Sequence, residues 1–198
     1  MKAPKRIESP SEIEPRVARS GSAWNSNGTT WEDKDVTSWA TKTLERYLNS
    51  ASAHVPGASF GSEPSDKSID ETGDHSEAVR LLFSPLLVRV KNVSSCAGTA
   101  SLNTSRGTLR RGWDYTFKLD WEVESTDTPG KAVCEGTLEY VDVTSCVVPP
   151  SSVKITFKEK GPSDGKFTSR LHEAVKALQG DITKSLENFT EELGKLQM

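Results

Sequence analysis

The sequence predicts an α+β fold with an N-terminal helix, a four-stranded antiparallel β-meander and a long C-terminal helix packed on the sheet. Apolar and polar residues alternate from 113 to 123, which is typical of a strand with one buried face. From 167 to 196 an apolar residue recurs at every third or fourth position, as on one stripe of a helix. An antiparallel sheet with one apolar face needs a cover, and this helix supplies one.

The centre of the predicted sheet is the alternating segment, whose apolar residues we expect to be buried. Residues 81–90 begin the strand region, and Pro129-Gly130 forms a turn into a returning strand over 132–140. Residues 153–157 repeat the alternation as a further strand. The buried face of the central strand is predicted to consist of Trp113, Tyr115, Phe117, Leu119, Trp121 and Val123.

Two segments have the spacing of amphipathic helices. The first runs from about 35 to 48, with Asp35 or Thr37 as its cap. The second is the long C-terminal helix, in which Gly180 is the weak point because glycine costs roughly 1 kcal/mol relative to alanine.

The remaining segments are poor in apolar residues. Residues 1–28 are expected to form a flexible N-terminal arm, because they offer little apolar surface to offset the entropy of ordering. The domain itself is expected to span 29–198, with a disordered insertion at about 50–77 that is rich in Ser, Gly, Pro, Asp and Glu.

Composition and motifs argue against several classes of protein. The net charge of -3 does not favour nucleic-acid binding. There is no apolar run of the roughly 20 residues that cross a bilayer, and no secretory signal, so we expect a cytoplasmic protein that does not bind membranes. His54 and His75 fall in the predicted insertion and His172 on a solvated helix face, and no phosphate loop or nucleophile motif is present. We therefore expect no enzyme, no catalytic residues, no metal site and no cofactor.

Three stretches resemble the N-terminal domain of the activator of heat-shock protein 90 ATPase. Residues 31–39 hold a tryptophan, a short charged stretch and a second tryptophan that opens the first helix. Residues 98–103 end in small residues and Asn103, and a basic-glycine turn at Arg106-Gly107 follows. Residues 113–121 form an aromatic strand that ends in Lys-Leu-Asp-Trp. The similarity runs from about 25 to 196 without the insertion, and the chain resembles the single-domain form of the family.

The resemblance implies a co-chaperone that binds the middle domain of heat-shock protein 90 as a monomer and stimulates its ATPase. Where the family has Trp-His the chain has Thr29-Thr30, and only one of three basic residues remains in the turn. Because the second domain of the usual two-domain activator is also missing, we expect weak stimulation. The alternative interpretation is a small-ligand or lipid carrier of α+β fold, with a cavity between helix and sheet. The partner-binding residues that the resemblance implies are Asn25, Asn27, Trp31, Asn103, Arg106 and Gly107, with Arg110 and Arg111 just after the turn.

Overall fold

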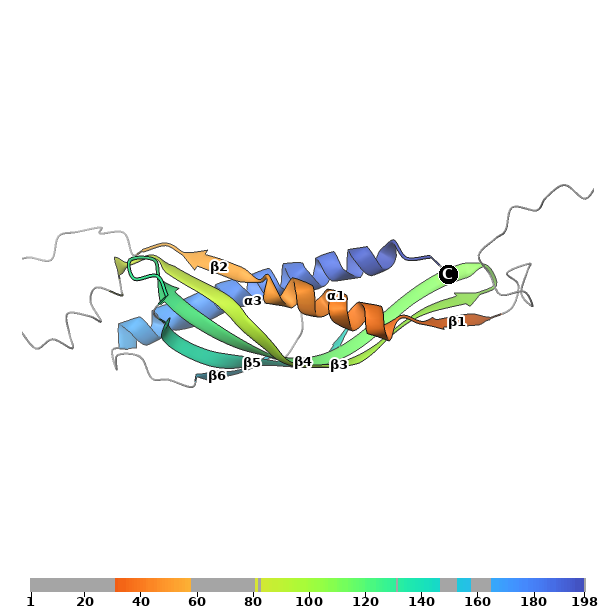
Figure 1. The fold of residues 1–198 in the computed structure, drawn as a ribbon, viewed down its shortest axis with the longest axis horizontal. Helices are drawn as coiled ribbons and strands as arrows, with labels where there is room; N and C mark the ends of the chain where they lie inside the picture. The colour runs from red at the N-terminus through yellow and green to blue at the C-terminus, as the bar shows by residue number, and fades with distance from the viewer. Residues whose placement is uncertain are drawn as a thin grey trace, which may run out of the picture.

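The computed structural model describes residues 31–57, 81, 83–130, 132–146, 153–157 and 165–197. Within these ranges the chain forms one antiparallel sheet whose strand order is β1-β3-β4-β5-β6, with β2 also paired to β3. Helices α1 and α3 lie together on one face of this elongated, curved sheet (Figure 1). The elements are β1 (Glu32–Asp35), α1 (Thr37–Asn49), β2 (Ser52–Val55), β3 (Leu86–Ser105), β4 (Thr108–Ser125), β5 (Ala132–Thr144), β6 (Val153–Phe157) and α3 (Gly165–Gly194).

The predicted α+β architecture is confirmed, but the sheet has six strands where four were expected. The additional strands, β1 and β2, pair with the same edge of β3 near its two ends, and α1 connects them. Both are four residues long. β1 is entirely polar and carries no alternation, and β2 alternates polar and apolar residues over only four positions, inside a segment that was expected to be disordered. Their extended conformation depends on the hydrogen bonds that β3 offers.

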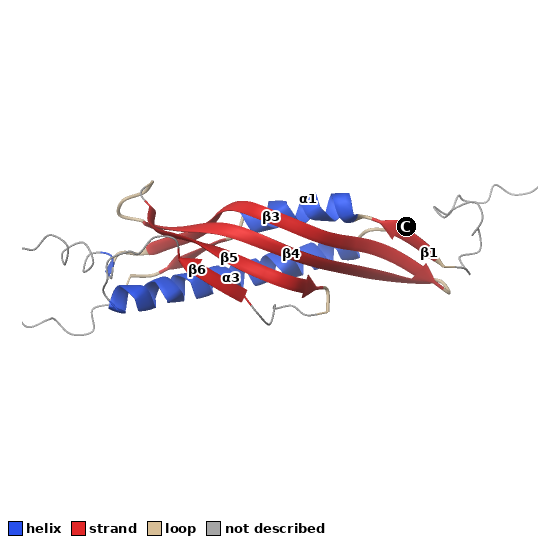
Figure 2. Cartoon of the chain, turned by 90° about the horizontal axis from the view of Figure 1, so that it is seen from below, coloured by secondary structure: helices blue, strands red, loops and turns tan. Residues whose placement is uncertain are grey.

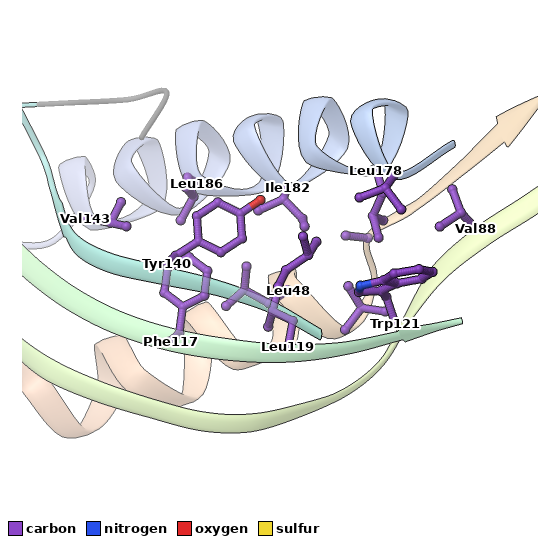
Figure 3. Packing of buried hydrophobic residues seen from close by; sticks show 14 of the residues in the cluster. Leu48, Val88, Phe117, Leu119, Trp121, Tyr140, Val143, Leu178, Ile182 and Leu186 are labelled. Carbon is purple, nitrogen blue, oxygen red and sulfur yellow. The ribbon is translucent and has the colours of Figure 1, made fainter. Parts of the chain in front are cut away.

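The core lies between the helices and the face of the sheet that they cover, here called the inner face. Trp113 and Trp121 are buried on this face, as predicted, and Phe117 stacks on Tyr140 with ring centroids 4.8 Å apart. Leu178, Ile182 and Leu186 of α3 point toward the same aromatic side chains (Figure 3). Gly136, directly opposite Trp121, leaves room for the indole, since a Cβ there would collide with the ring. The alternation in β4 therefore reports the buried face correctly.

Part of the predicted disordered insertion is ordered. Residues 52–55 form β2, so His54 lies in a strand, while residues 58–77 of the predicted insertion lie outside the described residues. Arg170 of α3 joins the two described ends of this part of the chain. Its Nη2 donates to the carbonyl oxygens of Pro56 and Ser84, at 3.0 and 2.5 Å. Both carbonyls therefore lie beside one guanidinium that is 7% exposed.

The helices differ slightly from the prediction. Helix α1 begins at Thr37, whose backbone N–H donates to Asp35 Oδ1 at 2.8 Å, and α3 continues through Gly180 without a break. Leu81 and Phe83, predicted to begin the strand region, are helical. None of the described helices combines the length and apolar character needed to span a membrane.

Candidate partner-binding site

The turn between β3 and β4 forms one end of the molecule, here called the distal end, together with β1 and the C-terminal end of α3 (Figure 2). Two residues, Arg106 and Gly107, connect the paired residues Ser105 and Thr108. Both have positive φ, 52° for Arg106 and 78° for Gly107, as a type I′ hairpin turn requires. Glycine adopts this conformation readily, whereas arginine is strained there. Both residues are exposed.

A row of polar side chains crosses the distal end on the face of the sheet opposite the helices, here called the outer face. Asp33 of β1 pairs with Asn103 of β3, which in turn pairs with Arg110 of β4. Asn103 donates from Nδ2 to Ser101 Oγ at 3.2 Å. Trp31, immediately before β1, is 67% exposed. The distal end thus brings an aromatic, an acidic, an amide and a basic residue close together.

Arg111 does not join this row. It precedes the buried Trp113 by two positions and pairs with Leu102, so it lies on the inner face. Its Nη2 donates to the carbonyl oxygen of Leu196, just after α3, at 3.0 Å. Arg110 and Arg111, both expected among the partner-binding residues, therefore face opposite sides of the sheet.

The charge at the distal end is mixed. Arg106 and Arg110 are exposed and basic, but Asp33 and Asp35 of β1 are exposed and acidic. Hydrogen bonds from the side chain and backbone of Thr37 lower the pKa of Asp35, so this carboxylate stays ionised at neutral pH. The surface at the distal end therefore carries exposed groups of both signs.

Of the predicted site residues, the structure gathers five around the turn and β1 at the distal end and places a sixth, Arg111, at the same end on the inner face. Asn25 and Asn27 lie outside the described residues. Sequence reasoning did not select Asp33, Asp35 or Lys34, because their proximity to the turn follows from the pairing of β1 with β3. The five that gather are Trp31, Asn103, Arg106, Gly107 and Arg110.

Side chains capable of catalysis are scattered over the described residues. No group of three or more His, Cys, Asp or Glu side chains among them could hold a metal ion. The three cysteines are free thiols. Burial, with a smaller effect of Glu45, raises the pKa of Cys96 to about 11, so this thiol is a poor nucleophile at neutral pH. His172 packs edge-on against Phe157, with ring centroids 5.0 Å apart.

Comparison with known proteins identifies the family to which this fold belongs. The sequence model of the family described as "Activator of Hsp90 ATPase, N-terminal" matches residues 33–197, from β1 to the end of α3. This chain belongs to that family. Members of the activator family are related to Hsp90 co-chaperones and are activators rather than enzymes themselves. A search of the curated proteins found no match.

Two solved structures extend the comparison. The chain is similar to the crystal structure of Aha-1 from Plasmodium falciparum, with a TM-score of 0.57 and 16% identity over 82% of this chain and 88% of that one. The solution structure of the human Aha1 N-terminal domain also matches, with a TM-score of 0.44 and 18% identity over 82% and 99% of the two chains. The similarity to the Plasmodium structure shows that this chain has the same fold as that protein, although few residues are identical.

Proposed function

We propose that this protein is a co-chaperone that binds the middle segment of heat-shock protein 90 through its distal end and weakly stimulates the ATPase of that partner. Membership of the activator family supports the class of partner. The observation that carries the choice of surface is Arg106, an exposed arginine held in a left-handed conformation at the tip of the hairpin. The partner supplies the nucleotide chemistry, so this chain needs no cofactor and no catalytic residue.

The conformation of Arg106 favours a role in binding. Asn and Gly are the residues that a type I′ turn prefers, and a left-handed conformation costs other residues about 1–2 kcal/mol. Arginine at this position therefore weakens the turn while placing a cation at the exposed tip of the hairpin. Strain of this kind often accompanies a functional site.

Stimulation follows from preferential binding to one conformation of the partner. A module that binds the ATPase-competent arrangement more tightly shifts the equilibrium toward it, by no more than the difference between the two affinities. The turn of this chain retains one basic residue, which limits the electrostatic part of that difference. We therefore expect weak stimulation, by a monomer acting in the cytoplasm without nucleic acid or membrane.

The test is Arg106→Asn, which removes the charge and keeps a residue that the turn prefers. We expect unchanged or higher thermal stability, together with a fall in affinity for the isolated middle segment of about two- to fivefold at low salt, the range of an exposed ion pair. Calorimetric titration at two salt concentrations and ATP turnover by the intact chaperone measure both effects. Raised salt should shrink the difference between the variants, because exposed charges are screened.

A matched control removes a positive charge far from the distal end. Lys176→Gln changes an exposed residue of α3 and should alter neither affinity nor turnover. If the parent protein gives no binding heat and no change in turnover at high concentration, the proposed function is wrong. If both variants lose affinity equally, net charge rather than the turn is responsible.

The ligand-carrier alternative has little support. A carrier would need an open cavity over the aromatic inner face, but Tyr115, Phe117 and Trp121 are fully buried there. Phe189 of α3 packs edge-on against the ring of Trp113, with centroids 5.5 Å apart. Side chains of α3 therefore occupy the space in which a ligand would bind (Figure 3).

A further inference from the structure

Two neighbouring rows of residues cross β1, β3 and β4 at the distal end, and they face opposite sides. Asp33, Asn103 and Arg110 form the outer row described above. The inner row lies one residue along each strand, where Lys34 pairs with Leu102, which pairs with Arg111. Leu102 is fully buried, so the inner row has an apolar centre between two cations.

Both cations of the inner row reach the chain that follows α3. Arg111 Nη2 donates to the carbonyl oxygen of Leu196 at 3.0 Å, and Lys34 Nζ donates to that of Gln197 at 3.3 Å. Both acceptors belong to the residues that follow the last helical residue, Gly194, and a hydrogen bond from a charged donor is stronger than one between neutral groups. Leu196 itself packs against the core. Three segments far apart in the sequence are thus joined at one point.

Leu102 and Arg111 of the inner row lie on the two strands that form the exposed hairpin. β1 pairs with β3 only as far as Thr104, so β3 and β4 alone form the exposed turn, and a two-stranded ribbon is only marginally stable in water by itself. The bond from Arg111 to the end of α3 links β4 to the longest helix of the fold, close to Arg106 and Arg110.

We infer that Arg111 and Lys34 are positioning residues: they fasten the end of α3 to the hairpin and so set the orientation in which Arg106 and Arg110 meet a partner. The inference rests on the proposed function for the identity of that partner. Arg111 acts through α3 and makes no contact with the partner, whereas Arg110, its neighbour in sequence, makes one.

Arg110→Gln and Arg111→Gln form a matched pair, because each removes one positive charge from adjacent positions of one strand. Amide exchange is measured over residues 104–109 and 193–197, and affinity for the isolated middle segment is measured by titration at several salt concentrations. For Arg111→Gln we expect exchange in both segments to rise roughly three- to tenfold, the effect of losing one hydrogen bond from a charged donor. Affinity should fall with an unchanged salt dependence, and Arg111→Lys should restore much of the protection and affinity.

For Arg110→Gln we expect the reverse pattern, with unchanged exchange and a weaker dependence of affinity on salt. Lys34→Gln should behave as Arg111→Gln does. The inference is overturned if Arg111→Gln leaves exchange unchanged, or if it weakens the salt dependence as Arg110→Gln does. If the parent protein does not bind the middle segment, the proposed function fails, while the exchange measurements still decide whether Arg111 fastens α3.

Discussion

At the scale of single residues, a hydrogen bond between Tyr47 and Glu192 joins the two helices. Tyr47 OH donates to Glu192 Oε2 at 2.5 Å, and Arg46 Nη2 donates to the same oxygen at 3.0 Å. The hydrogen bond from the tyrosine, together with the charge and hydrogen bond of Arg46, lowers the pKa of Glu192 below its usual value of 4.5. A carboxyl whose pKa is depressed on folding stabilises the protein above its unfolded pKa, and that contribution disappears as the pH falls through the folded pKa.

Tyr47→Phe tests this linkage while keeping the ring. We expect the pKa of Glu192 to rise toward its usual value, so that less stability is lost as the pH falls below 4.5. Titration of the Glu192 carboxyl by NMR and urea unfolding at several pH values measure the two effects. Arg46→Gln should also raise the pKa of Glu192, because Arg46 lowers it through both its charge and its hydrogen bond. An unchanged pKa in Tyr47→Phe would show that the hydrogen bond does not form in solution.

At the scale of elements, β4 is the strand on which the sheet depends. It pairs with β3 along its whole length and with β5 over much of it, and its apolar side chains face α3. Trp121 is fully buried, lies opposite Gly136 and packs edge-on against Phe157 of β6 at 5.3 Å. The indole therefore links β4, β5 and β6.

Trp121→Ala should lower the free energy of unfolding by about 3–5 kcal/mol, the range for a large buried aromatic residue. Trp31→Ala is the matched control, because Trp31 is 67% exposed, and it should change stability by no more than about 0.5 kcal/mol. Urea unfolding of both variants measures the difference. Equal stability of the two variants would mean that the register of β4 is wrong.

At the scale of the whole molecule, the two ends of the fold are stabilised differently. At the distal end, Lys34 and Arg111 donate hydrogen bonds to backbone carbonyls just after α3. At the opposite end, Arg170 donates hydrogen bonds to the carbonyls of Pro56 and Ser84. Because both of these carbonyls bond to one guanidinium, the segment between them starts and finishes at nearly the same point. A short connection can therefore replace it.

Replacing residues 58–80 with a short Gly-Ser linker should change the free energy of unfolding by less than about 1 kcal/mol, because loop-closure entropy depends weakly on length. A replacement that starts at residue 50 also removes β2 and the buried Val55, and should cost roughly 2 kcal/mol or more. Thermal and urea unfolding of the two variants make the comparison. A large loss of stability in the shorter replacement would show that residues 58–80 contribute to the core.

The distribution of apolar residues along the sequence was sufficient to predict the long helix, the central strand and the buried side of each. These features depend on periods of two and of three to four residues, which are local properties of the chain. The same alternation, continued back from Trp113, places Arg111 on the inner face. It does not show what Arg111 meets there, because Leu196 lies 85 residues further along the chain.

Only the tertiary structure decided the remaining features of the candidate site. The strands β1 and β2 are only four residues long, and they are extended because β3 offers hydrogen-bonding groups at its edge. The row of Asp33, Asn103 and Arg110 exists because three strands from distant parts of the sequence align in one register. Register and the position of a helix end depend on the packing of the whole core, so a local pattern of residues does not contain them.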